Sequence, residues 1–382
     1  MMLRILTVRE HKSVIFCDIC TSDAHREQLL VEKELFPDIN LKVGDVLDCA
    51  IHIGLNRRGE SVAILDEVIS LYGHTNFSSY KSFSENSKQA SSGELQSAKD
   101  NFLNGGSALS ARILRNSILE FVESYMKERD VCREYTPITT PYRGTSIAAP
   151  QRAEGVYTGH KYIKITHELG LKIACYLMLK SVYEIGYVCR DRYDNQTNLN
   201  EFLTIEGVIL SSAAFSLDSF FYDIWGKAIE TSDRLGIDVS NDFKDIVHVD
   251  FIKEYGKKPL KKDAKECLDF YEGLMSTIPH MIITNAPIDS PFVLSSEGEF
   301  PTETKWIFHG KGIGHGYPDE YRFDSVINSF EEQKLLLKSK NIESDLPIDY
   351  LNILSSAGFP TLSFAVGIER LVGIIMDNIK IR

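Results

Sequence analysis

Hydrophobic and polar residues alternate in short runs along the first part of the chain, a pattern that predicts β-strands with one buried face. Turn-forming stretches such as "TSDAH", "LKVGD" and "NRRG" separate the runs. The expected strands are "RILTVRE", "SVIFCDI", "REQLLVE", "DVLDCAIHIG" and "ESVAILDEVISL". Five such strands are typical of a small closed barrel such as an OB-fold, although another small β-domain would have the same strand count. We place this domain at residues 1–73.

The next segment, residues 74–108, has a different composition. It is rich in serine, asparagine and lysine and has few β-branched residues. This composition predicts a linker, with at most a short helix in "GELQSAKDNFL".

From residue 109 to residue 382 the hydrophobic pattern indicates a mixture of helices and strands. Helical periodicity is clear in "LSARILRNSILEFVESYMKERD", "HELGLKIACYLMLK", "IERLVGIIMDN" and in residues 212–235, 324–340 and 347–357. The expected strands are "KYIKIT", "VYEIGYVC", "FLTIEGVIL", "HMIIT", "KWIFHG" and "TLSFAVG". Helices do not separate these strands at regular intervals, so we expect an α+β domain with an antiparallel sheet flanked by helices.

Composition excludes some classes of protein. The net charge is −12, which argues against a general nucleic-acid coat or a membrane-surface binder but leaves room for a local basic groove. No apolar stretch approaches the length of a membrane span, and the first residues lack the layout of a signal peptide. Seven scattered cysteines suit a reducing cytosol, so we expect a cytoplasmic protein. Cys17 and Cys20 form a CxxC pair within a predicted strand, where a metal or redox site is not expected.

Two arginines follow apolar strands and suggest an anion-binding site. Arg190 directly follows "VYEIGYVC", and a charge at the end of a buried strand must be paired or must face a site. Arg370 falls in the first helical turn after Gly367, where backbone N–H groups and the helix dipole favour anions. With the aromatic Phe202 nearby in sequence, these residues suit ATP: one arginine at the α-phosphate, the other at the γ-phosphate, and the ring on adenine. The alternative for each arginine is a plain ion pair, with Asp191 or Glu206 as partners of Arg190.

Three segments in order after the barrel, "EYTPITTP", "VYEIGYVCR…NEFLTIEG" and "FPTLSFAVGIER", resemble motifs 1, 2 and 3 of the class II aminoacyl-tRNA synthetases. The resemblance is closest to a divergent lysyl enzyme of the lysyl, aspartyl and asparaginyl subgroup, whose members carry an N-terminal OB-fold. It implies a homodimer with Pro137 at the interface, and ATP and Mg²⁺ as cofactors. It also implies that Arg190 and Arg370 are catalytic, and that Arg190 binds the α-phosphate and the carboxylate being activated.

The resemblance implies further binding residues. Expected ATP contacts are Arg190, Arg192, Asn198, Phe202, Gly367 and Arg370. Glu168, in "KITHELGLK", matches a glutamate that binds the substrate α-amino group, and Glu206 and His315 are expected near the amino acid. The alternative for Glu168 is an exposed helix acid. In the barrel, Phe16 and Gln28 match residues that recognise an anticodon base, although Phe16 could be an ordinary core residue.

The sequence also departs from the family pattern. Arg192 and Asn198 stand where the family has glutamate and histidine, and "GIGHGYPDE" has Gly312 and Asp319 where the family has two magnesium-binding glutamates. We therefore expect a weakened Mg²⁺ site, with Asp319 as the remaining ligand and Arg192 supplying part of the missing charge. Ser363 and Ala365 replace glycines of motif 3, and the chain ends at "DNIKIR", before the family's usual end.

These features together predict a specialised paralogue that activates lysine or a related amino acid as an adenylate and transfers it to an acceptor, with tRNA favoured. Two alternatives remain open. The chain could pass the aminoacyl group to a small molecule, a peptide or a carrier protein, or it could be a non-catalytic regulator that binds an amino acid or RNA. The sequence does not show whether residues 238–278 contact RNA.

Overall fold

The computed structural model describes most of the chain. The described residues are 1–21, 26–56, 59–72, 107–143, 150–155, 159–191, 199–237, 239, 244–278, 280–288, 292–294, 298–308 and 310–377. Nearly all of the expected linker, residues 74–108, therefore lies outside them. The chain forms two compact units, Met1–Asn116 with Arg234–Ile237, and the remainder. The boundary between the units falls within helix α3 (Ser107–Glu128), and the limits of the linker stay a prediction.

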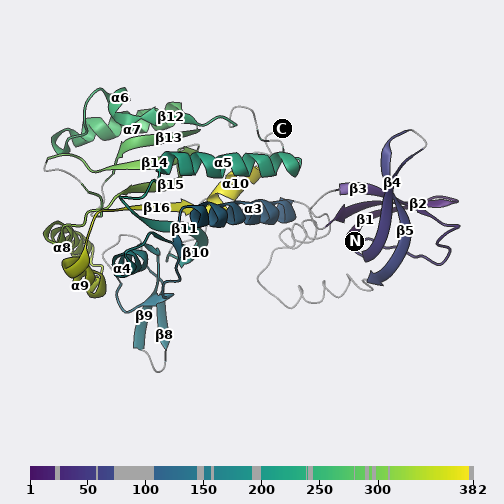
Figure 1. Cartoon of the computed structure of the whole chain (residues 1–382), viewed down its shortest axis with the longest axis horizontal. Helices are drawn as coiled ribbons and strands as arrows, with labels where there is room; N and C mark the ends of the chain where they lie inside the picture. Colours follow the sequence, from purple (N-terminus) through teal and green to yellow (C-terminus); the bar gives the residue numbers. More distant parts are fainter. Residues whose placement is uncertain are drawn as a thin grey trace. The chain divides into compact units, whose positions relative to one another are not determined.

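The N-terminal unit contains a closed five-stranded barrel (Figure 1). Its strands are β1 (Met2–Glu10), β2 (Val14–Thr21), β3 (Arg26–Glu32), β4 (Val46–Leu55) and β5 (Ser61–Tyr72). They pair in the order β1-β2-β3-β5-β4, and β1 pairs with β4 to close the barrel. Alternate residues of each strand point inward, so Cys17, Ile19, Leu29 and Val31 are fully buried. The expected OB-type barrel is confirmed.

An eight-stranded sheet forms the centre of the second unit, in the order β12-β13-β14-β15-β16-β11-β10-β6. Its strands are β6 (Cys132–Arg133), β10 (Val182–Cys189), β11 (Glu201–Leu210), β12 (Val247–Asp250), β13 (His280–Pro287), β14 (Thr302–Phe308), β15 (Lys311–Pro318) and β16 (Thr361–Gly367). Neighbours from β13 to β10 are antiparallel, as expected, whereas the edge strands β12 and β6 are parallel to their partners. The expected α+β fold is confirmed, and the two edge strands, β6 and β12, each pair in parallel with their neighbour.

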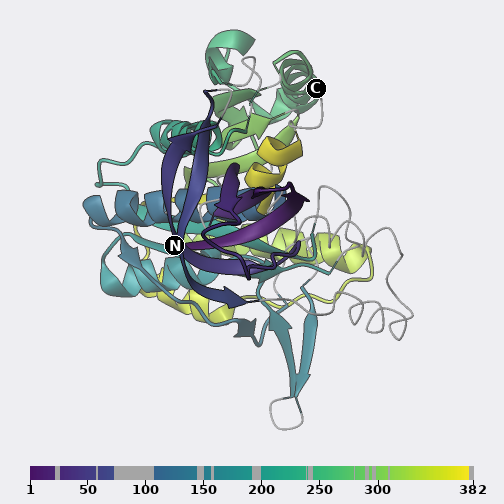
Figure 2. The ribbon, with the colours of Figure 1, turned by 90° about the vertical axis from the view of Figure 1, so that its right-hand side faces the viewer.

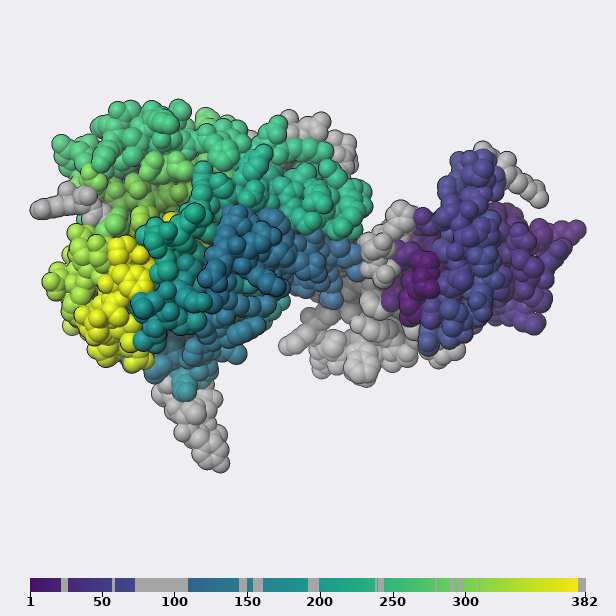
Figure 3. All heavy atoms as spheres, in the orientation of Figure 1, coloured from purple at the N-terminus to yellow at the C-terminus, as the bar shows by residue number. Residues whose placement is uncertain are grey.

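Helices α3 and α5 (Leu217–Arg234) cover one face of this sheet. Phe221 of α5 stacks on Trp306 of β14, and Phe220 packs edge-on against Phe364 of β16. Tyr125 of α3 contacts Phe220 in turn. Figure 3 shows α3 in blue beside α5 in teal at the surface of this unit. These aromatic contacts fill the apolar side of the sheet and leave the opposite side for polar residues.

The remaining helices surround the other parts of the sheet. They are α4 (Glu168–Met178), α6 (Phe251–Tyr255), α7 (Ala264–Thr277), α8 (Phe323–Ser339), α9 (Ile348–Ala357) and α10 (Ile368–Asp377), with a short 3₁₀ turn at Lys261–Asp263. One core cluster joins α4, α8 and α9 through Tyr176, Phe330 and Tyr350, and another joins α6 and α7 to β13. Thus part of the segment 238–278, whose role the sequence left open, packs against the edge of the sheet.

A second, three-stranded sheet has the order β7-β9-β8. It consists of β7 (Thr139–Thr140), β8 (Arg152–Gly155) and β9 (Gly159–Ile163). Figures 1 and 2 both show β8 and β9 extending away from the large sheet as a hairpin. The chain returns from β9 to the large sheet immediately before α4, which places residues 164–168 beside the polar face.

Candidate active site

The register of the large sheet gathers polar residues on one face. Directly opposed residues in neighbouring strands share a face, and residues two apart along a strand do so as well. Glu206 and His315 both oppose Ala365, and His315 also opposes Lys305. The same rule places a larger set on this face: Glu184, Thr204, Glu206, Glu303, Lys305, His315, Tyr317 and Ser363.

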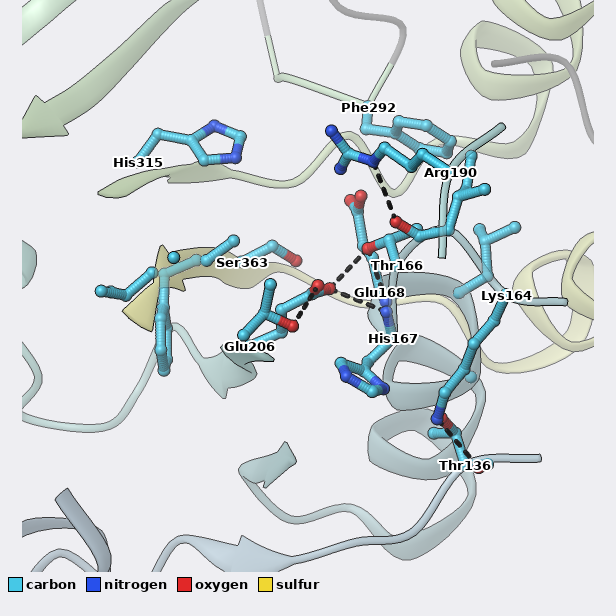
Figure 4. Close-up of a pocket in the computed structure, with 18 of the residues that line it drawn as sticks. Thr136, Lys164, Thr166, His167, Glu168, Arg190, Glu206, Phe292, His315 and Ser363 are labelled. Carbon is cyan, nitrogen blue, oxygen red and sulfur yellow. Dashed lines mark hydrogen bonds between the residues drawn. The ribbon is translucent and has the colours of Figure 1, made fainter. Parts of the chain in front are cut away.

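A cavity of about 820 Å³ lies against this polar face. Residues of β11, β14, β15 and β16 line it, together with Arg190 after β10, the first turns of α4 and α10 and residues of the segment 136–143. A volume of this size accommodates a nucleotide and a small second ligand. Figure 4 shows Arg190, Glu168 and Glu206 around this cavity, with His315 on its other side.

Arg190 lies at the end of β10, at the edge of the cavity. Its backbone N–H donates to Asn200 O at 2.8 Å, which closes the β10–β11 hairpin, and its Nε lies 3.4 Å from Ile165 O. The guanidinium lies 5.1 Å from the centre of the Phe202 ring, so a cation–π contact fixes both groups. Arg192 and Asn198 lie outside the described residues.

Arg370 reaches the same cavity from α10. Its Nη1 donates to Gly312 O at 2.5 Å, and its neighbour Glu369 accepts a hydrogen bond from the Leu203 N–H at 2.6 Å. These two contacts tie the first turn of α10 to β15 and β11. The structure therefore brings Arg190, Phe202, Gly367 and Arg370, predicted from separate stretches of sequence, to one cavity.

Glu168 begins α4 and belongs to a network of buried charges. Its Oε1 accepts hydrogen bonds from Lys172 Nζ at 2.7 Å and from the Tyr317 hydroxyl at 2.9 Å. The fully buried Lys172 ammonium also lies 2.9 Å from Asp319 Oδ1. Burial disfavours its charge, but Asp319 and Glu168 outweigh this effect and hold the pKa of Lys172 well above its usual value.

Asp319, expected as a metal ligand, is buried and does not line the cavity. It is 1% exposed, and its Oδ2 accepts hydrogen bonds from the hydroxyls of Thr361 at 2.7 Å and Ser363 at 2.8 Å. With Lys172 on its other oxygen, the carboxylate neutralises an internal cation. A hard cation needs accessible oxygen ligands, which this buried and paired carboxylate does not offer.

Glu206 also has internal partners. Its Oε2 accepts hydrogen bonds from the Thr166 hydroxyl at 2.5 Å and the His167 N–H at 2.8 Å, and Oε1 accepts from the Thr204 hydroxyl at 3.0 Å (Figure 4). Thr166 in turn accepts from the Glu168 N–H, so Glu206 positions the first turn of α4. Its side chain lines the cavity while remaining only 4% exposed.

A third buried carboxylate, Glu184, anchors the strand before Arg190. It accepts hydrogen bonds from Lys164 Nζ at 2.8 Å and from the Thr136 N–H and hydroxyl at 2.9 and 2.6 Å. His167 Nδ1 lies 3.1 Å away. Burial alone would raise the pKa of Glu184, but the contacts with His167, Lys164 and Thr136 lower it from 4.5 to about 2.

At the other end of the cavity, Glu303 joins Lys305 and His315. Its Oε1 lies 3.2 Å from Lys305 Nζ, and its Oε2 lies 3.1 Å from His315 Nδ1. Gly312, on the neighbouring strand, lines the same region and contributes no side chain. Within the described part of the chain, no group of three or more His, Cys, Asp or Glu residues has the arrangement of a metal site. The described residues therefore do not fit the Mg²⁺ site that the family resemblance implies.

The other predicted residues lie away from the cavity, except Pro137. Phe16 and Gln28 both lie on the outer face of the barrel, partly exposed, because Cys17 and Leu29 of the same strands point into the core. Pro137 lines the cavity, and the flanking Tyr135 and Ile138 are each 70% exposed.

Sequence reasoning missed several polar residues that line the cavity or are buried behind its wall. Glu184 and Lys172 interrupt apolar stretches, "VYEIGYVC" and "HELGLKIACYLMLK", and a charge in an otherwise buried stretch was the available signal. Lys305, in "KWIFHG", gave a similar but weaker signal. Lys164 and Thr136 gave none, because their common partner, Glu184, becomes apparent only in the folded chain.

The comparisons with known proteins agree with this geometry. The sequence model of the tRNA synthetases class II (D, K and N) matches residues 106–382. Lysine–tRNA ligase of Mycoplasma capricolum is 24% identical over 307 residues, covering 70% of this chain and 61% of the relative. Lysine–tRNA ligase of Aster yellows witches'-broom phytoplasma is 24% identical over 314 residues, covering 71% and 62%. The chain thus spans less than two thirds of the length of these relatives.

A solved structure is similar over nearly the whole chain. Asparaginyl-tRNA synthetase from Pyrococcus horikoshii, crystallised with asparaginyl-adenylate, aligns with a TM-score of 0.70 and 14% identity. The alignment covers 98% of this chain and 90% of that one, and at this identity it shows the fold. No helix within the described residues is long and apolar enough to cross a membrane.

Proposed function

The chain belongs to the class II (D, K and N) tRNA synthetases, and from this premise we propose that it activates an amino acid with ATP and transfers it to tRNA. In the first step an amino-acid carboxylate oxygen would attack the α-phosphorus of ATP. The bond to the bridging oxygen breaks, and aminoacyl adenylate and pyrophosphate form. Mg²⁺ usually accompanies ATP in such chemistry. The protein contributes positioning and charge stabilisation.

The observation that carries this proposal is the meeting of Arg190 and Arg370 in one cavity. Guanidinium groups bind phosphate and carboxylate oxygens through paired hydrogen bonds. Arg190, held by Phe202, is suited to the α-phosphate and the substrate carboxylate, and Arg370 to the terminal phosphates. Phe202 provides a ring on which adenine can stack.

The charges beside α4 favour an amino acid with a cationic side chain. Lys172 pairs with both Glu168 and Asp319, and Glu206 accepts hydrogen bonds from neutral donors, so the carboxyl groups here outnumber this ammonium. The α-ammonium of a substrate, near Glu168, would offset one excess charge, and a side-chain cation would offset the other. We therefore propose lysine or a related diamino acid, and His315 as a further contact on the opposite wall.

The partly exposed Phe16 and Gln28 of the barrel support tRNA as the acceptor. An aromatic ring that stacks on an unpaired base and an amide that reads its edge are typical of single-stranded RNA recognition. A cytoplasmic location follows from this proposal, because ATP, amino acids and tRNA meet there. The second candidate is a ligase that forms the same adenylate and transfers its aminoacyl group to a small molecule, peptide or carrier protein. Ser363 and Ala365, which replace glycines of motif 3, favour this alternative.

We also propose that the chain forms a homodimer through the segment around Pro137. Tyr135 and Ile138 expose large apolar side chains there, and Tyr187 of β10, close to the sheet edge, is 50% exposed. Exposed apolar side chains of this size are typical of a subunit interface. Light scattering should give twice the mass of the chain, and a monomeric mass would refute this assembly.

Amino-acid-dependent exchange of pyrophosphate into ATP tests the activation step. We expect exchange with lysine or a close analogue such as ornithine when all amino acids are compared. No exchange with any amino acid would favour a regulator that only binds. Transfer to intact tRNA but not to periodate-oxidised tRNA would show that the terminal ribose is the acceptor, whereas transfer to a non-RNA acceptor alone would favour the second candidate.

A further inference from the structure

The side chain of Lys305 occupies the space next to Gly312 where the family pattern has a magnesium-binding glutamate. Gly312 opposes Ile307 across β14 and β15, and Lys305 lies two residues before Ile307 on the same face. A Cβ atom placed on Gly312 would lie 3.4 Å from Cε of Lys305, at van der Waals contact. A longer side chain at position 312 would therefore meet the lysine, and Lys305 fills the region into which a glutamate would extend.

The ammonium of Lys305 is held in this position. Its Nζ lies 3.2 Å from Glu303 Oε1, and the side chain lines the cavity while remaining only 30% exposed. Partial burial disfavours its charge, but Glu303 outweighs this effect and raises the pKa of Lys305. The group is thus a cation at neutral pH, and Glu303 fixes the direction in which it points.

The carboxylates of Glu303 and Asp319 are not available to hold a divalent ion. Glu303 is 3% exposed, and its two oxygens face Lys305 and His315. Asp319 is 1% exposed and is paired with Lys172. Mg²⁺ binds oxygen ligands, and a neighbouring ammonium repels it, so the charges of this wall oppose a protein-bound metal.

The same wall is suited to phosphate oxygens. Lys305 and Lys311 line it from β14 and β15, and Arg370 reaches it from α10. The hydrogen bond from Arg370 Nη1 to Gly312 O, at 2.5 Å, holds the glycine backbone and the guanidinium together. Lys305 and Arg370, from two separate elements, therefore lie beside the place where the missing glutamate would stand.

We propose that Lys305 is a built-in cation that takes the place of a protein-bound divalent ion beside the nucleotide phosphates. The inference rests on the proposed function, because it takes the ligand of this cavity to be ATP. The chain then recognises the free nucleotide tetra-anion, with the charge of the terminal phosphates offset by Lys305, Lys311 and Arg370. ATP binding consequently depends little on Mg²⁺.

Calorimetric titration with ATP, in excess EDTA and then in excess Mg²⁺, tests the proposal without requiring turnover. For the wild-type chain we expect dissociation constants that differ by less than about threefold between the two conditions. Lys305→Gln should weaken ATP binding at least tenfold in EDTA. Lys253→Gln, on an 80% exposed lysine of α6, is the matched control and should leave binding unchanged.

A double variant, Lys305→Glu with Gly312→Glu, should restore the metal requirement, so that Mg²⁺ tightens ATP binding at least tenfold. Wild-type binding that occurs only with Mg²⁺ would overturn the role of Lys305 and leave the proposed function intact. Equal affinity of wild type and Lys305→Gln in EDTA would overturn it as well. If the wild-type chain binds no ATP in either condition, the proposed function and this inference both fail.

Discussion

Lys172 is the residue that neutralises the carboxylates beside α4. It is fully buried between Glu168 and Asp319 and lies 4.6 Å from the ring centre of Phe292. Removing one member of a buried ion pair leaves its partner charged in a medium of low polarity. The geometry of the substrate pocket therefore depends on the ammonium of Lys172, which is buried behind the residues that line the cavity.

Lys172→Met should lower the free energy of unfolding by about 3–5 kcal/mol, because Asp319 and Glu168 lose their counter-charge. Urea denaturation measures this loss. Lys334→Met, at a partly exposed lysine of α8, is the control and should stay within about 0.5 kcal/mol of wild type. Adding Asp319→Asn to Lys172→Met should recover part of the loss. If Lys172→Met unfolds like the control, the buried pair does not have the role described.

Glu184 makes the stability of the unit depend on pH in the acid range. Its pKa is lowered from 4.5 to about 2 in the folded chain, so its contribution is complete above 4.5 and is lost as the pH falls through 2. That contribution amounts to at most about 3 kcal/mol.

The free energy of unfolding of the wild-type chain should decline between pH 4.5 and pH 2 more steeply than that of Glu184→Gln, whose side chain does not titrate. Denaturant titrations at several pH values measure both slopes. Glu123→Gln, at an exposed carboxylate of α3, should keep the wild-type slope. Equal slopes for wild type and Glu184→Gln would show that Glu184 does not contribute in this way.

Sequence alone identified the charged residues that end strands but not those that pair inside the fold. Arg190 stands out because it directly follows an apolar stretch, where a charged side chain must be paired or must face a site. Arg370 stands out because it falls in the first helical turn after Gly367, where an anion is favoured. The pairing of Lys172 with Asp319 joins residues far apart in the chain, and no local pattern predicts it. The expected metal role of Asp319 followed from family resemblance, which does not show how deeply a side chain is buried.

Among the elements, strands rich in β-branched and aromatic residues were predicted closely and the glycine-rich strand was missed. β10 and β16 have the bounds that their apolar runs predict. β15 lies between β14 and β16 in the sheet, yet its glycines at 312, 314 and 316 resemble a loop. Close packing explains two of them: a Cβ on Gly316 would lie 2.7 Å from Leu217 of α5, and one on Gly314 would lie 3.2 Å from Phe221.

Gly207 of β11 likewise allows close packing, here against Phe364 on the face of the sheet that α5 covers. A Cβ at this position would lie 2.3 Å from Cε1 of Phe364, on the face that α5 covers. Gly207→Ala should therefore cost about 1–3 kcal/mol through overpacking. Gly226→Ala, at an open position of helix α5, should be neutral or slightly stabilising because alanine favours the helix. Thermal denaturation compares the two, and equal melting temperatures would contradict the packing account.

At the scale of the whole molecule, the two units should carry separable functions. The cavity with Arg190 and Arg370 belongs to the second unit, and the partly exposed Phe16 and Gln28 belong to the barrel. Phe16→Ala should weaken tRNA binding about tenfold, as expected for the loss of one stacked base, and leave ATP–pyrophosphate exchange unchanged. Filter binding and exchange assays on the same preparation measure both. Undiminished tRNA binding would remove the proposed role of this face of the barrel.

The central claim is that one cavity binds ATP through two guanidinium groups, one at the end of β10 and one in the first turn of α10. ATP–pyrophosphate exchange, measured side by side for wild type, Arg190→Ala and Arg370→Ala, tests it most directly. We predict that each variant exchanges pyrophosphate at least about 100-fold more slowly than wild type, while its melting temperature and oligomeric mass stay unchanged. Exchange at the wild-type rate in either variant would contradict the account.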